Sequence, residues 1–425
     1  MIKKYQKKLN DSKVIVPTNF KTLHKKKKKI GLSITIAGIF LFSLVFTLWF
    51  FADVPLLSPI NQFSTFKFLS GKEYKDPNQQ KIVYGFLPYW NINKTALHPQ
   101  LTHLAYFGLT VGPDGQIITK TSEGTEPGYN KLKNDVFFQL IDNLPDHKTK
   151  TELVLVQFNT EDIVSLLSSE KAQQNLLDNI DSLLLAYPFS GINIDIEYGG
   201  TVTPYLREKM TQLVTTINHH LDQKYANVTL SIDMYASAAD NYTIWDVPKI
   251  AKEVDFIVIM AYDFHRRSSS VAGPVAPIFG GKTLWDSDIS QHLKAFLSAT
   301  SKDKLLLGVP FYGYEWQTTS DNPQALTIPN TGVTASYQRV QEVLEKKEEL
   351  GVEEHWNEEA LSPYLVYKED GTTHILYFDN SRSLSYKLDF VNQLDLKGIA
   401  IWALGYEGDY QELWDIINRK LMVDN

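Results

Sequence analysis

The sequence predicts an α/β protein. We expect a (β/α)8 TIM barrel with a small α+β insertion before its last strand, preceded by one N-terminal transmembrane helix. Eight short apolar runs follow residue 81, and most of them are apolar on both faces. Such runs are typical of parallel strands covered by helices. Segments with helical periodicity lie between them, and repeated alternation of strand and helix favours a closed barrel.

The first 51 residues divide into a charged and an uncharged part. Residues 1–29 hold eleven lysines and one acid, a net charge of about +10, and because the whole chain carries −7 the remainder carries about −17. Two parts of such opposite charge are expected to meet different surroundings. Residues 30–51 contain no charge. As a helix they would extend about 33 Å, enough to cross a hydrocarbon core of roughly 30 Å.

We interpret residues 30–51 as a retained signal anchor. Lys25–Lys29 adjoin the apolar segment, and no small-residue cleavage site follows Phe51. This pattern predicts a single-pass protein of the cell membrane, with residues 1–29 as a basic cytoplasmic tail and the barrel outside the cytoplasm. A cleavable signal peptide is the alternative. The lysines are explained by topology and anionic lipid, so we expect no nucleic-acid partner. Residues 52–80, with three prolines and no periodicity, are interpreted as a stalk.

The predicted barrel domain covers residues 81–425. Its strands are expected in the runs that begin at residues 81, 101, 152, 191, 228, 255, 305 and 398. Helical patterns occupy residues 175–187 and 203–221, and Thr203 is suited to cap the second, with Pro204 at its first position. The insertion is expected at about residues 315–380. It contains a helical stretch and a hairpin pattern with Asp370-Gly371 at the turn.

The run "GINIDIEYGG", residues 191–200, carries a polar side chain at every second position. Asn193, Asp195 and Glu197 share one face of the predicted strand, and isoleucines occupy the other. In a barrel the polar face points inward and leads to the carboxyl end, where active sites of this fold lie. Burying Asp195 beside Glu197 raises at least one carboxyl pKa, which suits a general acid. An exposed edge strand is the alternative.

Four motifs resemble those of one enzyme family. "SGINIDIE" resembles the signature strand DGxDxDxE of family 18 glycoside hydrolases, the chitinase family. "IMAYDFH" is similar to the family's Met-x-Tyr-Asp strand, and "LLLGVPFYGY" and "GIAIWALG" to its seventh and eighth strands. The resemblance extends from residue 81 to about 415. "GPVAP" and "NEEALSPY" are most similar to the bacterial branch that includes spore-cortex-lytic N-acetylglucosaminidases.

The resemblance implies a reaction and the residues that perform it. Glu197 matches the general acid/base, and Asp195 matches the carboxylate that orients the substrate's acetamido group. Tyr262 matches the hydroxyl that bonds the acetamido carbonyl. In this family the N-acetyl oxygen of the substrate is the nucleophile. The implied activity is therefore cleavage of β-1,4 linkages with retention of configuration, and no metal or cofactor is expected.

Further residues are implied to bind the sugar. Met260 and Asp263 match residues that line the same subsite, and Trp402 matches the floor under the distorted sugar. Aromatic side chains near strand ends, Trp90 and Tyr106, are candidates for stacking on sugar rings, although core packing is the alternative for both.

The chain departs from the family pattern at three positions. Ser190 stands in place of the first Asp and Asn193 in place of the second, whose acid helps Asp195 change partners during turnover. Asn193 can hydrogen-bond Asp195 but holds no proton, so a lower activity or a shifted pH range is expected. Phe86 stands where many members have a tyrosine. The loss of the acid at Asn193 and of the hydroxyl at Phe86 predicts a less polar base of the site.

Two functions follow from these residues. The first is a membrane-anchored glycosidase that acts on an N-acetylglucosamine-containing polysaccharide, either peptidoglycan or a chitin-type glycan. The second is a lectin-like barrel that binds glycans without cleaving them. Lectin-like members typically lose the acid glutamate, and the presence of Glu197 favours the enzyme.

Overall fold

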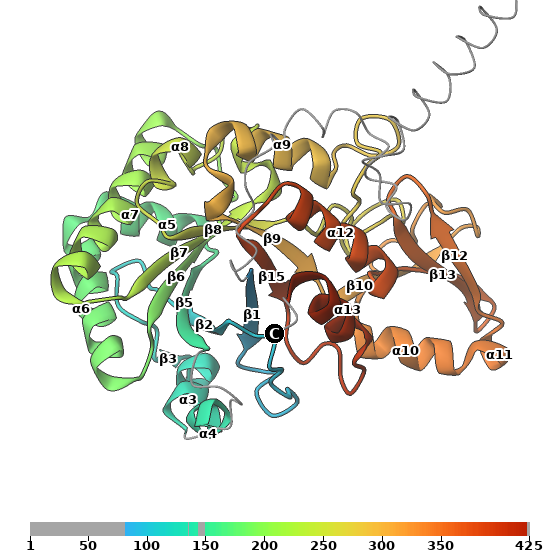
Figure 1. Cartoon of the computed structure of the whole chain (residues 1–425), viewed down its shortest axis with the longest axis horizontal. Helices are drawn as coiled ribbons and strands as arrows, with labels where there is room; N and C mark the ends of the chain where they lie inside the picture. Colours follow the sequence, from blue (N-terminus) through green and yellow to red (C-terminus); the bar gives the residue numbers. More distant parts are fainter. Residues whose placement is uncertain (1–80, 135, 143–148, 423–425) are drawn as a thin grey trace, which may run out of the picture. The chain divides into compact units, whose positions relative to one another are not determined.

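A computed structural model describes residues 81–134, 136–142 and 149–422 of the chain. Eight parallel strands close into a barrel (Figure 1), and each of the eight predicted runs forms one of them. Around the barrel the order is β1 (Ile82–Pro88), β15 (Gly398–Trp402), β9 (Leu305–Pro310), β8 (Phe256–Met260), β7 (Thr229–Tyr235), β6 (Gly191–Ile196), β5 (Lys150–Gln157) and β2 (His103–Thr110). The predicted barrel is thereby confirmed.

Helices surround the barrel and cover the outer faces of its strands (Figure 1). The two predicted helical patterns lie within α6 (Glu170–Ala186) and α7 (Pro204–Lys224). Thr203 caps α7 as expected, since its hydroxyl accepts a hydrogen bond of 3.2 Å from the backbone N of Leu206. The remaining helices are α3 (Pro127–Lys133), α4 (Val136–Asp142), α5 (Thr160–Ser168), α8 (Val247–Ile250), α9 (Ile289–Ala299), α12 (Ser381–Gln393) and α13 (Glu412–Leu421).

Short elements complete the connections between strands and helices. A two-stranded ribbon of β3 (Lys120–Thr121) and β4 (Gly124–Thr125) follows β2. Single 3-10 turns, Ala236–Ala239 and Lys302–Lys304, follow β7 and precede β9.

The insertion is a five-stranded antiparallel sheet with two short helices. Its order is β11 (Val333–Ser336), β10 (Tyr312–Thr318), β14 (Thr372–Tyr377), β13 (Ser362–Glu369) and β12 (Glu353–Asn357), and α10 (Tyr337–Glu345) and α11 (Lys347–Leu350) follow β11. The predicted turn joins β13 to β14, and both Asp370 and Gly371 have positive φ, as a type I′ turn requires. The insertion begins three residues earlier than predicted, because β10 continues almost directly from β9.

The barrel interior combines an apolar core with a group of buried polar residues. Inward-facing Tyr84, Phe86, Phe107 and Val258 belong to one buried cluster. Every residue of β6 is buried, so its isoleucines and its polar side chains are both shielded from water. This arrangement confirms a central strand and excludes the exposed edge strand.

Within the described residues, no helix has the length and apolar character needed to cross a membrane. The predicted tail, anchor and stalk fall in residues 1–80, which lie outside the described part of the chain.

Candidate active site

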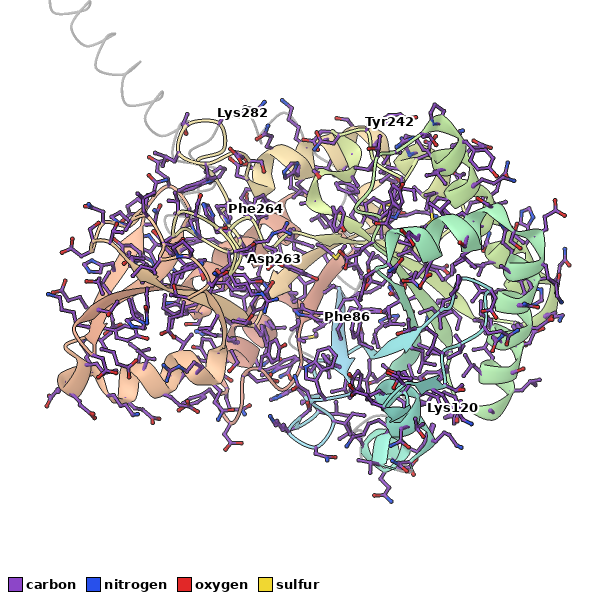
Figure 2. The ribbon with its side chains drawn as sticks, turned by 180° about the vertical axis from the view of Figure 1, so that it is seen from behind. Phe86, Lys120, Tyr242, Asp263, Phe264 and Lys282 are labelled. Carbon is purple, nitrogen blue, oxygen red and sulfur yellow. The ribbon has the colours of Figure 1, made fainter. Side chains whose placement is uncertain are left out.

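A cleft of about 1280 Å³ opens at the carboxyl ends of the barrel strands. Figure 2 shows Asp263 and Phe264, just after β8, where the barrel meets the sheet of the insertion. The insertion contributes Tyr312, Tyr314 and Thr334 to the lining. Among the residues predicted for the site, those that line the cleft are Trp90, Asp195, Glu197, Met260, Tyr262, Asp263 and Trp402.

Glu197 follows β6 directly and is partly exposed to the cleft. Its backbone N donates a hydrogen bond of 3.0 Å to the carbonyl of Gln157, which fixes the chain at this point. Burial raises the pKa of the Glu197 carboxyl, and the nearby charge of Asp263 acts in the same direction, whereas hydrogen bonding by Tyr235 lowers it. An acid whose pKa is raised and that faces a cleft is suited to protonate a leaving group.

Asp195 lies beneath Glu197 on the same inner face of β6 and is 4% exposed. Its Oδ1 is buried and accepts no hydrogen bond from any described residue. Burial raises the pKa of this carboxyl well above its usual range, and the charges of Asp233 and Glu197 raise it further. Because Asp195 also lines the cleft, its free oxygen can receive a donor from a bound substrate.

Asp263 is held by two tyrosines of the insertion. The hydroxyls of Tyr312 and Tyr314 both donate to its Oδ1, the latter over 2.9 Å. Asp263 itself adopts a left-handed backbone conformation, with a φ of 61°. Its carboxylate is therefore oriented by donors on one oxygen, which suits hydrogen bonding to a sugar hydroxyl.

Two tryptophans supply flat apolar surface in the cleft. Trp402, at the end of β15, packs edge-on against Phe107 with ring centroids 4.6 Å apart. Trp90 is 44% exposed and is also braced by Phe107, at 6.0 Å. Indole rings that are packed against Phe107 on one side and line the cleft on the other provide platforms for stacking on sugar rings.

Three predicted site residues do not line the cleft. Tyr106 points out of the barrel, because Ala105 and Phe107 take the inward positions of β2, and its hydroxyl donates to the carbonyl of Gly128 over 2.7 Å. Stacking of Tyr106 on a sugar is therefore wrong. Phe86 faces inward but is buried beneath Trp402, with ring centroids 5.7 Å apart, so it supports the floor rather than contacting a ligand.

Asn193 is fully buried, and its amide turns away from Asp195. Nδ2 donates to Ser231 Oγ at 2.9 Å and to Asp233 Oδ1 at 2.8 Å, which uses both of its hydrogens. The expected hydrogen bond from Asn193 to Asp195 is therefore not formed. The base of the site is also more acidic than predicted, because Asp233 and Glu152 lie there.

Sequence reasoning missed Asp233 and Arg266. The run "VTLSIDMY" places Ser231, Asp233 and Tyr235 on one face, the same alternation that drew attention to β6. That signal could have identified Asp233. Arg266 lies in the loop after β8 and lines the cleft, but no periodic pattern marks a loop residue.

The geometry defines a class of protein. A half-buried acid stands over a second buried carboxyl, beside an indole platform, in a cleft of about 1280 Å³. This combination equips a barrel to hydrolyse glycosidic bonds. The model of glycosyl hydrolases family 18 matches residues 74–407, and the chain belongs to this family. It is a glycosidase, as the resemblance implied.

Relatives place the chain near bacterial cortex-lytic enzymes. It is 24% identical to the cortical fragment-lytic enzyme of Bacillus anthracis over 345 residues, covering 79% of this chain and 70% of that protein. It is 29% identical over 261 residues to YdhD of Bacillus subtilis, whose name refers to a sporulation-specific glycosylase. That match covers 60% of this chain and just 56% of YdhD.

Solved structures share the fold. The Group IV chitinase of Ostrinia furnacalis in complex with allosamidin is similar with a TM-score of 0.69 at 22% identity, covering 80% of this chain and 98% of that one. The spore cortex-lytic enzyme SleL of Bacillus megaterium gives a TM-score of 0.63 at 21% identity, covering 83% of this chain and 77% of that one.

Proposed function

We propose that this protein hydrolyses β-1,4 linkages of an N-acetylglucosamine-containing glycan with retention of configuration, by substrate-assisted catalysis. The observation that carries the proposal is the pair of acids at the end of β6: Glu197 at the cleft, and Asp195 beneath it with a free buried oxygen. Asp195 is almost fully buried beneath Glu197, which suits it to orient a substrate group rather than to attack the anomeric carbon. Attack by the substrate's own acetamido oxygen fits this geometry.

Each residue then has a defined role. Glu197 gives its proton to the glycosidic oxygen as the bond to the anomeric carbon breaks, and the acetamido oxygen forms a bond to that carbon. Asp195 accepts the acetamido N–H and stabilises the positive charge of the cyclic intermediate. Tyr262 holds the acetamido carbonyl. Glu197, now a carboxylate, takes a proton from water, which adds to the anomeric carbon and restores the acetamido group.

One feature of the cleft favours a glycan that carries carboxylates. Arg266 lines the cleft, and no described carboxylate lies within ion-pair distance of its guanidinium. Its loop is held against the insertion: Trp316 Nε1 donates to the Arg266 carbonyl at 3.3 Å, and Thr327 donates from N and Oγ1 to the carbonyls of Ser270 and Ser269. A fixed loop that presents an unpaired cation suits peptidoglycan, whose stem peptides carry carboxylates, better than uncharged chitin.

The proposed location is the outer side of the cell membrane, anchored by residues 30–51. It rests on the uncharged segment, the lysines before it and the absence of a cleavage site after it. An anchored enzyme would remain close to the wall polymer that it cleaves.

The experiment that tests the activity compares wild type with Glu197→Gln. Both are incubated with a chromogenic N-acetylglucosaminide, chitin oligomers and purified peptidoglycan, and products are identified by mass spectrometry. Loss of the general acid is expected to lower kcat by about 10²–10⁴-fold while oligomers still bind. Equal product formation by both proteins would show that Glu197 is not the general acid. Binding by wild type with no cleavage of any glycan would favour the lectin-like alternative.

A further inference from the structure

We infer that Asp233, on β7, holds the proton that residue 193 holds in the family pattern. Asp233 is thus a positioning residue that sets the charge of Asp195. The inference rests on the proposed function, and it explains how a chain with Asn193 can retain the chemistry of its signature strand.

The sheet register places the two acids side by side. In the parallel pair β6–β7, Asn193 lies opposite Ser231 and Ile194 opposite Ile232. Continuing this register, Asp195 is level with Asp233. Both side chains point into the barrel, because they share the parity of Asn193 and Ser231. Neighbouring strands are about 4.8 Å apart, so the carboxyls are cross-strand neighbours.

Burial prevents both acids from being charged at once. Asp195 and Asp233 are 4% and 3% exposed, and neither forms an ion pair with a described cation. Two buried carboxylates without a cation repel strongly, so one of them keeps its proton. Burial raises the pKa of Asp233 well above its usual range, and the charges of Glu197 and Glu152 raise it further, against the lowering effect of the Asn193 hydrogen bond.

The hydrogen bonds show where a proton is needed. Asn193 uses both amide hydrogens on Ser231 and Asp233, and the Ser231 hydroxyl donates to Glu152 Oε2 at 2.7 Å. Oδ1 of Asn193 and Oδ1 of Asp195 are both buried acceptors without a donor. A proton shared by Asp195 and Asp233 supplies one donor within this group, whereas two carboxylates would leave both oxygens unsatisfied.

This shared proton allows Asp195 to change state during turnover. When a substrate presents its acetamido N–H, Asp195 must be an anion to accept that bond and to stabilise the positive intermediate. The proton then resides on Asp233, next to the same Asn193 amide. No proton leaves the site, and no oxidant, metal or further reactant is required. The other titratable groups that face this pair are Tyr84, Glu152, Glu197, Tyr235 and Tyr262.

The test exchanges the acid between the two strands. Asp233→Asn is expected to lower kcat at least 10-fold and to move the acidic limb of the pH–rate profile, with affinity for chitin oligomers changed less than threefold. The double variant Asn193→Asp/Asp233→Asn restores the number of acids beside Asp195 and is expected to recover most of the turnover. Asn193→Asp alone buries a third acid and is expected to reduce stability at neutral pH.

Ser231→Ala is the matched control, because it removes the other acceptor of the Asn193 amide without removing a carboxyl. It is expected to retain the wild-type pH profile. An unchanged profile in Asp233→Asn, a double variant that recovers nothing, or the same shift in Ser231→Ala would each overturn the inference. If Asp233→Asn does not fold, the double variant alone tests the inference. The inference requires that this double variant folds and turns over substrate.

A second measurement separates this inference from the proposed function. Infrared difference spectra detect the protonated carboxyl directly, whether or not a substrate is cleaved. At neutral pH the wild type is expected to show one more protonated acid than Asp233→Asn, and the double variant is expected to regain it. An inactive wild type that passes this test refutes only the proposed function. An active wild type that fails it refutes only the inference.

Discussion

The hydroxyl of Tyr314 donates a hydrogen bond of 2.9 Å to Oδ1 of Asp263. This bond joins β10 of the insertion to Asp263, the residue that follows Tyr262 in the barrel. The insertion therefore does more than form a wall of the cleft, because it also orients a carboxylate that lines it.

Tyr314→Phe is expected to lower kcat/KM about 5- to 10-fold. The variant loses one of the two hydroxyls that orient Asp263, and a hydrogen bond to a charged group contributes about 1.5–3 kcal/mol. Steady-state kinetics on chitin oligomers measure the effect. Tyr367→Phe is the matched control, since the Tyr367 hydroxyl bonds Glu315 at 2.6 Å within the same sheet. A comparable loss in both variants would mean that the sheet, and not Asp263, is responsible.

Asp195→Asn is expected to lower kcat by about 10²-fold or more and to affect binding much less. The variant removes the negative charge that stabilises the cyclic intermediate, but Asn still accepts a hydrogen bond from the acetamido group. A thiazoline analogue of the intermediate should inhibit the wild type strongly and this variant weakly. Ready hydrolysis of a glucoside without the 2-acetamido group, or a glycosyl ester trapped on Asp195, would contradict the mechanism.

Arg266→Ala is expected to reduce kcat/KM on peptidoglycan about 10-fold and on chitin oligomers less than twofold. The charge-assisted contact with a carboxylate is lost, whereas an uncharged glycan makes no such contact. Arg267→Ala is the control, because Arg267 is exposed in the same loop but does not line the cleft. Equal losses on both glycans would argue against a carboxylate-bearing substrate.

Glu152→Gln is expected to flatten the dependence of stability on pH. Burial raises the pKa of the Glu152 carboxyl to about 7, against the hydrogen bonds from Thr229, Ser231 and Tyr84. The folded protein thus holds a proton that the unfolded chain releases near pH 4.5. Its contribution to stability is complete below that pH and is lost as the pH rises to about 7.

The loss amounts to about 3 kcal/mol for a shift of this size. Chemical unfolding at pH 5 and pH 8 measures this loss. Between these two pH values, the free energy of unfolding of the glutamine variant should rise relative to that of the wild type by about that amount. Glu369→Gln is the control, at an exposed position beside the β13–β14 turn. Its free energy of unfolding should match that of the wild type at both pH values. If the free energy of unfolding depended on pH in the same way for Glu152→Gln and the wild type, the assigned pKa would be refuted.

Residues 30–51 are expected to remain in the mature protein and to hold the barrel outside the cytoplasm. Protease added to intact spheroplasts should remove the barrel while a cytosolic marker stays protected. Recovery of the full-length chain under those conditions would refute the topology. N-terminal sequencing of the mature protein distinguishes an anchor from a cleaved signal peptide.

The sequence was sufficient where a periodic pattern repeats. Doubly apolar runs identified each barrel strand, and alternation on β6 identified Asp195 and Glu197. The inward and outward positions were harder to tell apart on β2, where Leu104 to Phe107 are all apolar or aromatic, and the stacking candidate Tyr106 points away from the cleft. The partnership of Asp195 with Asp233 depends on the register between two strands separated by a 21-residue helix. A single sequence does not encode that register visibly.

Phe311, the single residue between β9 and β10, is fixed on both sides. Its N donates to the carbonyl of Trp402 at 2.8 Å, and its carbonyl accepts from the N of Tyr337 at 3.0 Å. The floor of the cleft and the insertion are thus joined through the backbone of one residue. A shift of β10 would therefore be transmitted to the backbone of Trp402. Variants meant to widen the cleft would therefore leave the Phe311 junction intact.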